Sequence, residues 1–155
     1  MKKTSLLSSA LLLLSSCIFG QAVNAVSVDP PQKILIWRGQ SATLKIHAKV
    51  LPGYHANSNK PHEDYLIPLR LTLDAAPLIV ESIEYPKGHD EKYTFSDKPL
   101  NVLTGDFDIL VKLKAPANLQ PQMHMLAGKL RYQACSDKAC LAPKTVELRI
   151  TADVR

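Results

Sequence analysis

Short apolar runs, separated by polar and turn-forming residues, make up most of the sequence after residue 25. In residues 43–50 every second position is apolar, which would place Leu44, Ile46, Ala48 and Val50 on one face of a strand and polar side chains on the other. This alternation is typical of a strand with one buried and one exposed face. The pattern therefore predicts a β-strand here.

Six similar runs occur elsewhere, and Pro, Gly, Asn or Asp separates them at short intervals. The predicted strands span residues 34–37, 43–50, 66–73, 78–85, 107–113, 125–132 and 145–150. Eleven prolines argue against long helices, because each removes a backbone donor and clashes with the preceding turn. About seven strands with turns between them predict an all-β sandwich. Residues 86–92 and 115–121 are expected to be loops.

The first 25 residues have the composition of an export signal. Two lysines precede an apolar run over residues 6–19, which is too short for a membrane-spanning helix, and the small residues 23–25 suit cleavage after Ala25. We expect a signal peptide at residues 1–25 and a single domain at 26–155. No later stretch is long and apolar enough to cross a bilayer, so the mature chain is expected to have no transmembrane segment.

Residues 14–17 offer a second processing route, because Leu-Ser-Ser-Cys resembles a bacterial lipobox. Cys17 would then become the lipidated first residue, and the protein would be a membrane-anchored lipoprotein. By either route two cysteines can still pair, and an exported chain meets an oxidising compartment. The formal net charge of +5 includes the two leader lysines, and no Lys/Arg cluster stands out, so we expect no nucleic-acid partner.

Cys135 and Cys140 are separated by four residues in a polar bend between two strand-like runs. A disulfide across so short a loop would stabilise the fold by only about 2 kcal/mol on the loop-entropy model. Three interpretations of the pair are open. It can be a dithiol that exchanges with partners through a mixed disulfide, a static disulfide that braces the hairpin, or part of a metal site.

Other chemistry has weaker support. Residues 53–63 contain His55 and His62, but their spacing follows no known ligand pattern, and zinc or copper needs three or four convergent ligands. We expect a polar loop there and no metal. The sequence contains no phosphate loop, dinucleotide fingerprint or Gly-x-Ser-x-Gly elbow. A Cys–His hydrolase is not expected either, because the nearest histidine to the cysteines in sequence, His124, lies on the preceding strand.

Two stretches carry a family resemblance. Residues 132–143 read YQACSDKACLAP and residues 53–61 read GYHANSNKP, and both resemble the N-terminal periplasmic domain of the thiol:disulfide interchange protein DsbD family. The resemblance extends from about Ile34 to Ile150. It implies an immunoglobulin-like β-sandwich in which Cys135 and Cys140 relay reducing equivalents outside the cytoplasm. No bound cofactor is expected.

The resemblance also implies a cap loop over the cysteines, and we assign it to residues 90–95, named the cap segment below. Asp90, Glu91, Tyr93 and Phe95 are its candidate shielding residues. A cover would limit exchange with wrong partners, because thiol reactivity depends on access. The alternative is that Tyr93 and Phe95 are ordinary edge or core aromatics.

The function that we expect is a periplasmic thiol:disulfide interchange domain, a component of a protein-disulfide reductase system. Its expected partners are thioredoxin-fold redox proteins and a membrane electron-donor protein. DsbD itself continues into a membrane-spanning domain and a thioredoxin-like domain, whereas this sequence stops at Arg155. The alternative, from another class, is a non-catalytic immunoglobulin-like binding or assembly module whose disulfide only braces its last hairpin.

Overall fold

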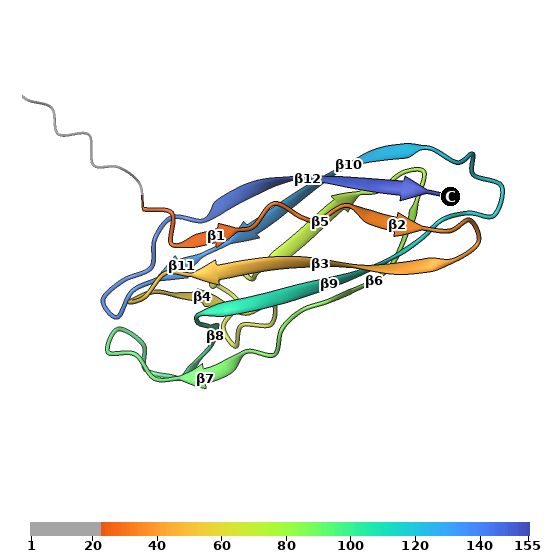
Figure 1. Ribbon diagram of the computed structural model, residues 1–155. Coiled ribbons are helices and arrows are strands. Elements are labelled where there is room, and N and C mark those ends of the chain that lie inside the picture. Colours follow the sequence, from red (N-terminus) through yellow and green to blue (C-terminus); the bar gives the residue numbers. More distant parts are fainter. Residues whose placement is uncertain (1–22) are drawn as a thin grey trace, which may run out of the picture.

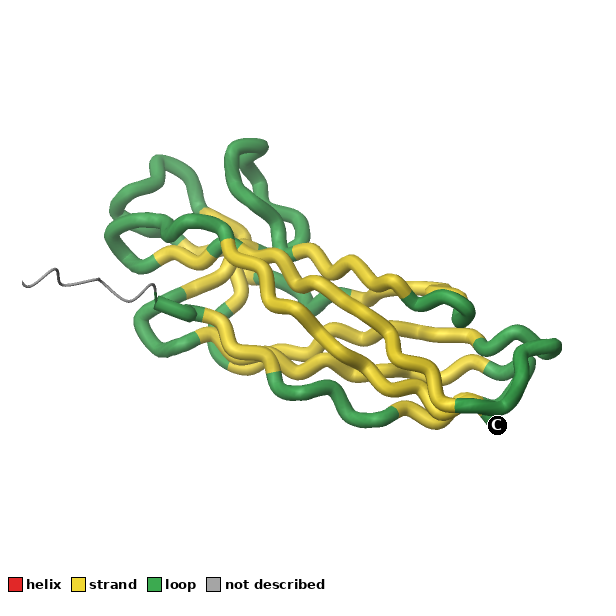
Figure 2. The backbone as a smooth tube through the Cα atoms, turned by 90° about the horizontal axis from the view of Figure 1, so that it is seen from above, coloured by secondary structure: helices red, strands yellow, loops and turns green. Residues whose placement is uncertain are grey.

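The computed structural model describes residues 23–155, and every regular element within that range is a β-strand. Two four-stranded sheets run along the length of the molecule, and a third, shorter-stranded sheet lies at one end (Figure 1). Seen from above, the longest loops gather at the end away from the C-terminus (Figure 2). The predicted all-β fold is confirmed, and the arrangement is an immunoglobulin-like β-sandwich.

Each of the three sheets contains four strands. The first sheet consists, in spatial order, of β1 (Val26–Val28), β3 (Ser41–Val50), β9 (Asp106–Lys114) and β6 (Ile79–Glu84). The second consists of β2 (Ile34–Ile36), β12 (Lys144–Val154), β10 (Met123–Tyr132) and β5 (Arg70–Asp74). The third consists of β11 (Ala134–Cys135), β4 (His55–Asn57), β8 (Leu100–Leu103) and β7 (His89–Glu91).

The inward faces of the two large sheets form the core. On β3 the predicted apolar face is buried, and Ile46 has no exposed surface, whereas the lysines between the apolar positions are exposed. Ile109 of β9, Leu130 of β10 and Ile150 of β12 are also fully buried. Each such side chain stabilises the fold by about 1.5–3 kcal/mol through removal from water. Most of the hydrophobic core therefore comes from the two large sheets, and Ala56, Leu103 and Ala134 of the third sheet join it at one end.

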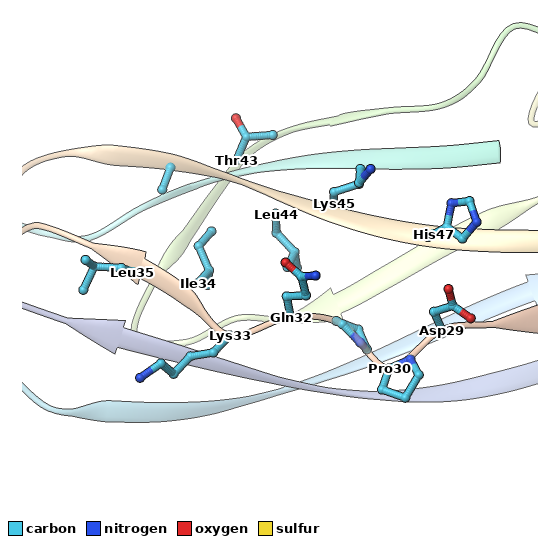
Figure 3. A pocket seen from close by; sticks show the side chains of 12 residues that line it. Asp29, Pro30, Gln32, Lys33, Ile34, Leu35, Thr43, Leu44, Lys45 and His47 are labelled. Atoms are coloured by element: carbon cyan, nitrogen blue, oxygen red, sulfur yellow. The ribbon is translucent and has the colours of Figure 1, made fainter.

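The chain changes sheets between its first two strands. β1 pairs antiparallel with β3, whereas β2 pairs parallel with β12. Pro30 and Pro31 lie in the connector, where the missing N–H groups cost no ladder bond. A cavity of about 590 Å³ lies between the connector and β3, and Ile34 and Leu44 line it from opposite sheets (Figure 3). Its lining contains no cysteine.

Two predicted strand boundaries were wrong by four residues, and the others differ by at most two. β5 begins at Arg70 rather than at residue 66, because Pro68 has no N–H for a ladder bond and Leu69 bonds instead to the carbonyl oxygen of Ser58. β12 continues to Val154 because both neighbouring strands pair with its last residues. Five short strands were not predicted, namely β1, β4, β7, β8 and β11, and β7 falls in the expected loop 86–92.

The third sheet positions the cysteine segment. β10 leaves the second sheet after Tyr132, and the chain then pairs with β4 through β11 before it returns as β12. β4 in turn pairs with β8, and β8 pairs with β7. The cysteines and the cap segment, about 40 residues apart in sequence, are therefore brought to the same end of the sandwich.

The predicted leader is described only from residue 23, so Cys17 and the lipobox lie outside the described residues. Within residues 23–155, no helix has the length and apolar character needed to span a membrane.

Candidate functional site

Cys135 and Cys140 form a disulfide with an S–S distance of 2.02 Å. The two residues oppose each other as an antiparallel bridge at the end of a hairpin, residues 134–141, which we call the cysteine hairpin. Their surroundings differ. Cys135 is 0% exposed, whereas Cys140 is exposed to solvent. A partner can therefore approach Cys140 but not Cys135.

The turn of the cysteine hairpin is held by Ser136. Its backbone N–H donates to the carbonyl oxygen of Ala139 at 2.9 Å, and its hydroxyl oxygen accepts the backbone N–H of Lys138 at 3.2 Å. Below the disulfide, the N–H of Leu141 donates to the carbonyl oxygen of Ala134 at 2.8 Å. The short polar side chain thus acts as expected of a turn residue, and the hairpin is closed on both sides of the sulfurs.

Two amide side chains attach the hairpin to the rest of the protein. Gln133 Oε1 accepts hydrogen bonds from Asn57 Nδ2 and from the backbone N–H of Ile67, both at 3.1 Å. Gln133 Nε2 donates to the carbonyl oxygen of Leu141 at 3.2 Å. Asn57 is fully buried. Because buried amides are costly when unpaired, this network favours one position of the hairpin against β4.

The cap segment lies against the cysteine hairpin. Tyr93 stacks on His55 with ring centroids 3.9 Å apart, and Phe95 follows 5.6 Å from Tyr93. Thr94 Oγ1 donates a hydrogen bond to the carbonyl oxygen of Asp137 at 3.0 Å, which joins the cap segment directly to the hairpin turn. Tyr93 therefore packs on the residue that opposes Cys135 and also on a small cluster of Leu66, Leu100 and Val102, and Phe95 lies beyond it.

Asp90 and Glu91 anchor the cap segment at its base. Asp90 Oδ1 accepts a hydrogen bond from Asn101 Nδ2 at 2.7 Å and lies 2.8 Å from His62 Nε2, and these contacts lower the pKa of Asp90. The Tyr93 hydroxyl donates to Glu91 Oε2 at 2.8 Å, which lowers the pKa of Glu91. The pKa of Tyr93 is raised, mainly by burial and to a smaller extent by the hydrogen bond to Glu91.

His55 is a site residue that the sequence reasoning missed. It was expected in a polar loop, and that expectation was wrong, because His55 lies in β4 with only 2% of its surface exposed. It directly opposes Cys135 in the β4–β11 pair. Burial is the main cause that lowers the pKa of His55. The nearby Glu91 raises this pKa, and His89 lowers it further. Its only signal in the sequence was its place in the stretch 53–61 that carries the resemblance.

The structure thus brings Cys135, Cys140, Tyr93 and Phe95 together at one end of the sandwich, with Asp90 and Glu91 below them. Among residues 23–155, no group of three or more His, Cys, Asp or Glu side chains is arranged to hold a metal ion. Cys135 and Cys140 lie at this end with the buried His55 opposite Cys135.

Comparison with solved structures supports the fold. The N-terminal periplasmic domain of ScsB from Proteus mirabilis is similar, with a TM-score of 0.60 and 11% identity. The match covers 84% of this chain and 47% of that one, so this chain spans about half the length of that structure. A cohesin–dockerin complex from Clostridium thermocellum matches with a TM-score of 0.46, 9% identity, and coverage of 85% and 100% of the two chains. The periplasmic chaperone SfaE matches with a TM-score of 0.41 and 8% identity, and the match covers 84% of this chain and 58% of that one.

Comparison with curated proteins gives no match. At these low identities the structural similarities concern the fold alone. The family comparison goes further, because the model described as the N-terminal part of thiol:disulfide interchange protein DsbD matches residues 23–152. That match covers well over half of the sequence, and so the chain belongs to the family of the DsbD N-terminal domain.

Proposed function

We propose that Cys135 and Cys140 form a redox-active pair that exchanges electrons with protein disulfides. Membership of the DsbD N-terminal family supports a thiol:disulfide interchange domain. The observation that carries the proposal is the unequal exposure of the two cysteines, because Cys140 is open to solvent and Cys135 is fully buried. Such a pair has one sulfur that a partner can reach and one that is kept from outside thiols.

Exchange then proceeds in two steps. In the reduced protein, the Cys140 thiolate attacks the partner's disulfide and forms a mixed disulfide, and one partner sulfur leaves as a thiolate. The Cys135 sulfur next attacks Cys140 Sγ, which restores the internal disulfide and releases the second partner sulfur. Two electrons pass from the cysteines to the partner, whose disulfide becomes a dithiol. A dithiol on an electron donor reverses the same steps and reduces the pair again.

The family assignment and the periplasmic ScsB domain that shares the fold support an extracytoplasmic location. Redox proteins are the partner class that the family implies. We propose thioredoxin-fold proteins as one partner and a membrane protein carrying a dithiol as the electron donor. The location of the site agrees with this, because β11, which ends at Cys135, lies at one end of the sandwich (Figure 1), and Cys140 is exposed there.

Trapping of mixed disulfides in the native host tests the proposal. Cys135→Ser keeps the exposed thiol and removes the resolving sulfur, so it should accumulate adducts that disappear on reduction. Cys140→Ser, which keeps only the buried thiol, should trap fewer adducts. The double variant, Cys135→Ser with Cys140→Ser, is the control and should trap none.

The alternative is the braced binding module. The amide contacts of Gln133 around the hairpin favour it, because they would hold the turn in place without any exchange. If no single variant forms adducts and the wild-type disulfide also resists a glutathione buffer poised at about −250 mV, the exchange function is wrong and the brace replaces it.

A further inference from the structure

Three side chains form a row across the third sheet. His55 on β4 directly opposes Cys135 on β11, and Cys135 directly opposes Cys140 across the hairpin. Opposed residues of antiparallel strands project to the same face of a sheet, with Cβ atoms about 4.5–5.5 Å apart. His55 and Cys140 are therefore the two cross-strand neighbours of the buried Cys135 on that face.

The imidazole of His55 has an unused nitrogen. Its Nε2 is buried and finds no hydrogen-bond partner among the described residues. Buried polar atoms are nearly always paired, so an unpaired one calls for an explanation. The disulfide offers one, since Cys135 Sγ has no proton while it is bonded to Cys140. Reduction gives this sulfur an S–H group, which is a donor.

We propose that His55 accepts the proton of the Cys135 thiol when the reduced protein closes its disulfide. This inference rests on the exchange function proposed above and assigns the proton transfer of its second step. A buried thiol resists ionisation because a thiolate is poorly solvated there, yet only the thiolate attacks a disulfide. An adjacent neutral imidazole removes that obstacle, as in other cysteine–histidine pairs.

The step balances in atoms and charge. In the mixed disulfide, His55 Nε2 takes the proton from Cys135 Sγ, and the resulting thiolate attacks Cys140 Sγ. The bond between Cys135 and Cys140 forms as the bond between Cys140 and the partner sulfur breaks. The partner sulfur leaves as a thiolate, and the imidazolium returns the proton to it, directly or through water. His55 is neutral again at the end.

The surroundings keep His55 in its accepting form. The titratable groups around it are Cys135 on β11, Glu91 and His89 on β7, and Tyr93 in the cap segment. Burial is the largest influence and lowers the pKa of His55 below its ordinary value of 6.5. The neutral imidazole therefore predominates from neutral pH upwards, and it is lost only as the pH falls through that lowered pKa.

The second step can be measured alone with the aromatic disulfide dithiobis(nitrobenzoate). Reduced protein should release one coloured thiolate when Cys140 forms the mixed disulfide and a second when Cys135 resolves it. Replacing His55 with Gln, or with Phe to keep the stacking on Tyr93, should slow the second release by about ten-fold or more at pH 7 and leave the first unchanged.

His124→Gln is the matched control. Its Nε2 is also buried without a hydrogen-bond partner among the described residues, but it lies on β10 opposite Ala152, away from the third sheet. This variant should release both thiolates at the wild-type rates. Circular dichroism checks that each variant is folded.

The pH profile of the wild-type protein gives a test that needs no variant. With His55 as acceptor, the second release should be nearly independent of pH between about pH 7 and 8, whereas without an internal acceptor it should rise about tenfold per pH unit. If the second release in the wild type rose tenfold per pH unit, or if His55→Gln or His55→Phe kept the wild-type rate, the role of His55 would be overturned. The proposed exchange function would still stand. If the wild type never releases the second thiolate, Cys135 does not resolve, and the proposed function fails with it.

Discussion

Gly88 illustrates how single residues fix the geometry below the cap segment. A Cβ atom at this position would lie 2.8 Å from Ser58 Cβ and would also collide with the side-chain oxygen of Asn101. The side-chain amide of Asn101 donates a hydrogen bond to Asp90. The backbone carbonyl oxygen of Asn101 accepts the backbone N–H of Ser58 at 3.0 Å. The absence of a side chain at Gly88 therefore lets the chain just before β7 pack closely against Asn101 and Ser58.

Gly88→Ala is expected to lower the free energy of unfolding by about 1–3 kcal/mol, because an added methyl group must displace packed neighbours. Urea denaturation measures this change. Lys87→Ala, at the exposed neighbouring position, is the control and should change stability by less than about 0.5 kcal/mol. Equal stability of Gly88→Ala and wild type would show that the space at β7 and β8 is looser than described.

The cap segment makes few contacts with β4 and with the cysteine hairpin. The ring of Tyr93 stacks on His55 of β4, and Thr94 donates a hydrogen bond to Asp137 of the hairpin. A stacked aromatic pair contributes about 0.5–1.5 kcal/mol beyond area burial, and a typical hydrogen bond about as much. Together these contacts amount to about 1–3 kcal/mol, so displacing the segment would cost little free energy.

Replacing both Tyr93 and Phe95 with alanine should speed alkylation of the Cys135 thiol in a reduced Cys140→Ser background. The reason is that removing the two rings exposes the buried side of the hairpin, while the core of the large sheets is untouched. Iodoacetamide labelling followed by mass spectrometry measures the rate. The control is Trp37→Ala, which removes an aromatic side chain that is 61% exposed just after β2. Unchanged labelling in the double variant would make the two rings ordinary edge aromatics.

Strand length decided which elements could be predicted from the sequence. β3 was predicted correctly because ten residues give its alternation room to show. β4, β7 and β11 have only two or three residues each, which is too few for a period, so residues 53–63 and 86–92 read as polar loops. The cysteine pair was visible in the sequence, and the cap segment followed from the resemblance. The position of His55 beside Cys135 could not be predicted, because its burial depends on strands from three distant parts of the chain.

In the whole molecule, the residues that contribute most to stability lie mainly in the two large sheets. The cysteines proposed to exchange electrons lie at the third sheet. The main cluster of buried apolar residues draws chiefly on both large sheets, with Ile109 and Ile150 among its fully buried members. The disulfide closes a loop with a sequence separation of only 5 residues and joins β11 of the third sheet to Cys140. Stability and redox chemistry should therefore respond to different substitutions.

Replacing both cysteines with alanine is expected to lower the free energy of unfolding by about 2 kcal/mol, since a short loop gains little from closure. A typical domain is stable by about 5–15 kcal/mol, so the variant should remain folded while it loses all exchange. Ile109→Ala should cost about 2–5 kcal/mol through the cavity left in the core, yet its folded fraction should exchange at the wild-type rate. Urea denaturation and release of thiolate from an aromatic disulfide measure the two properties side by side. If the cysteine variant unfolded at room temperature, the disulfide would be the main support of the fold, and an exchange that opens it repeatedly would be untenable.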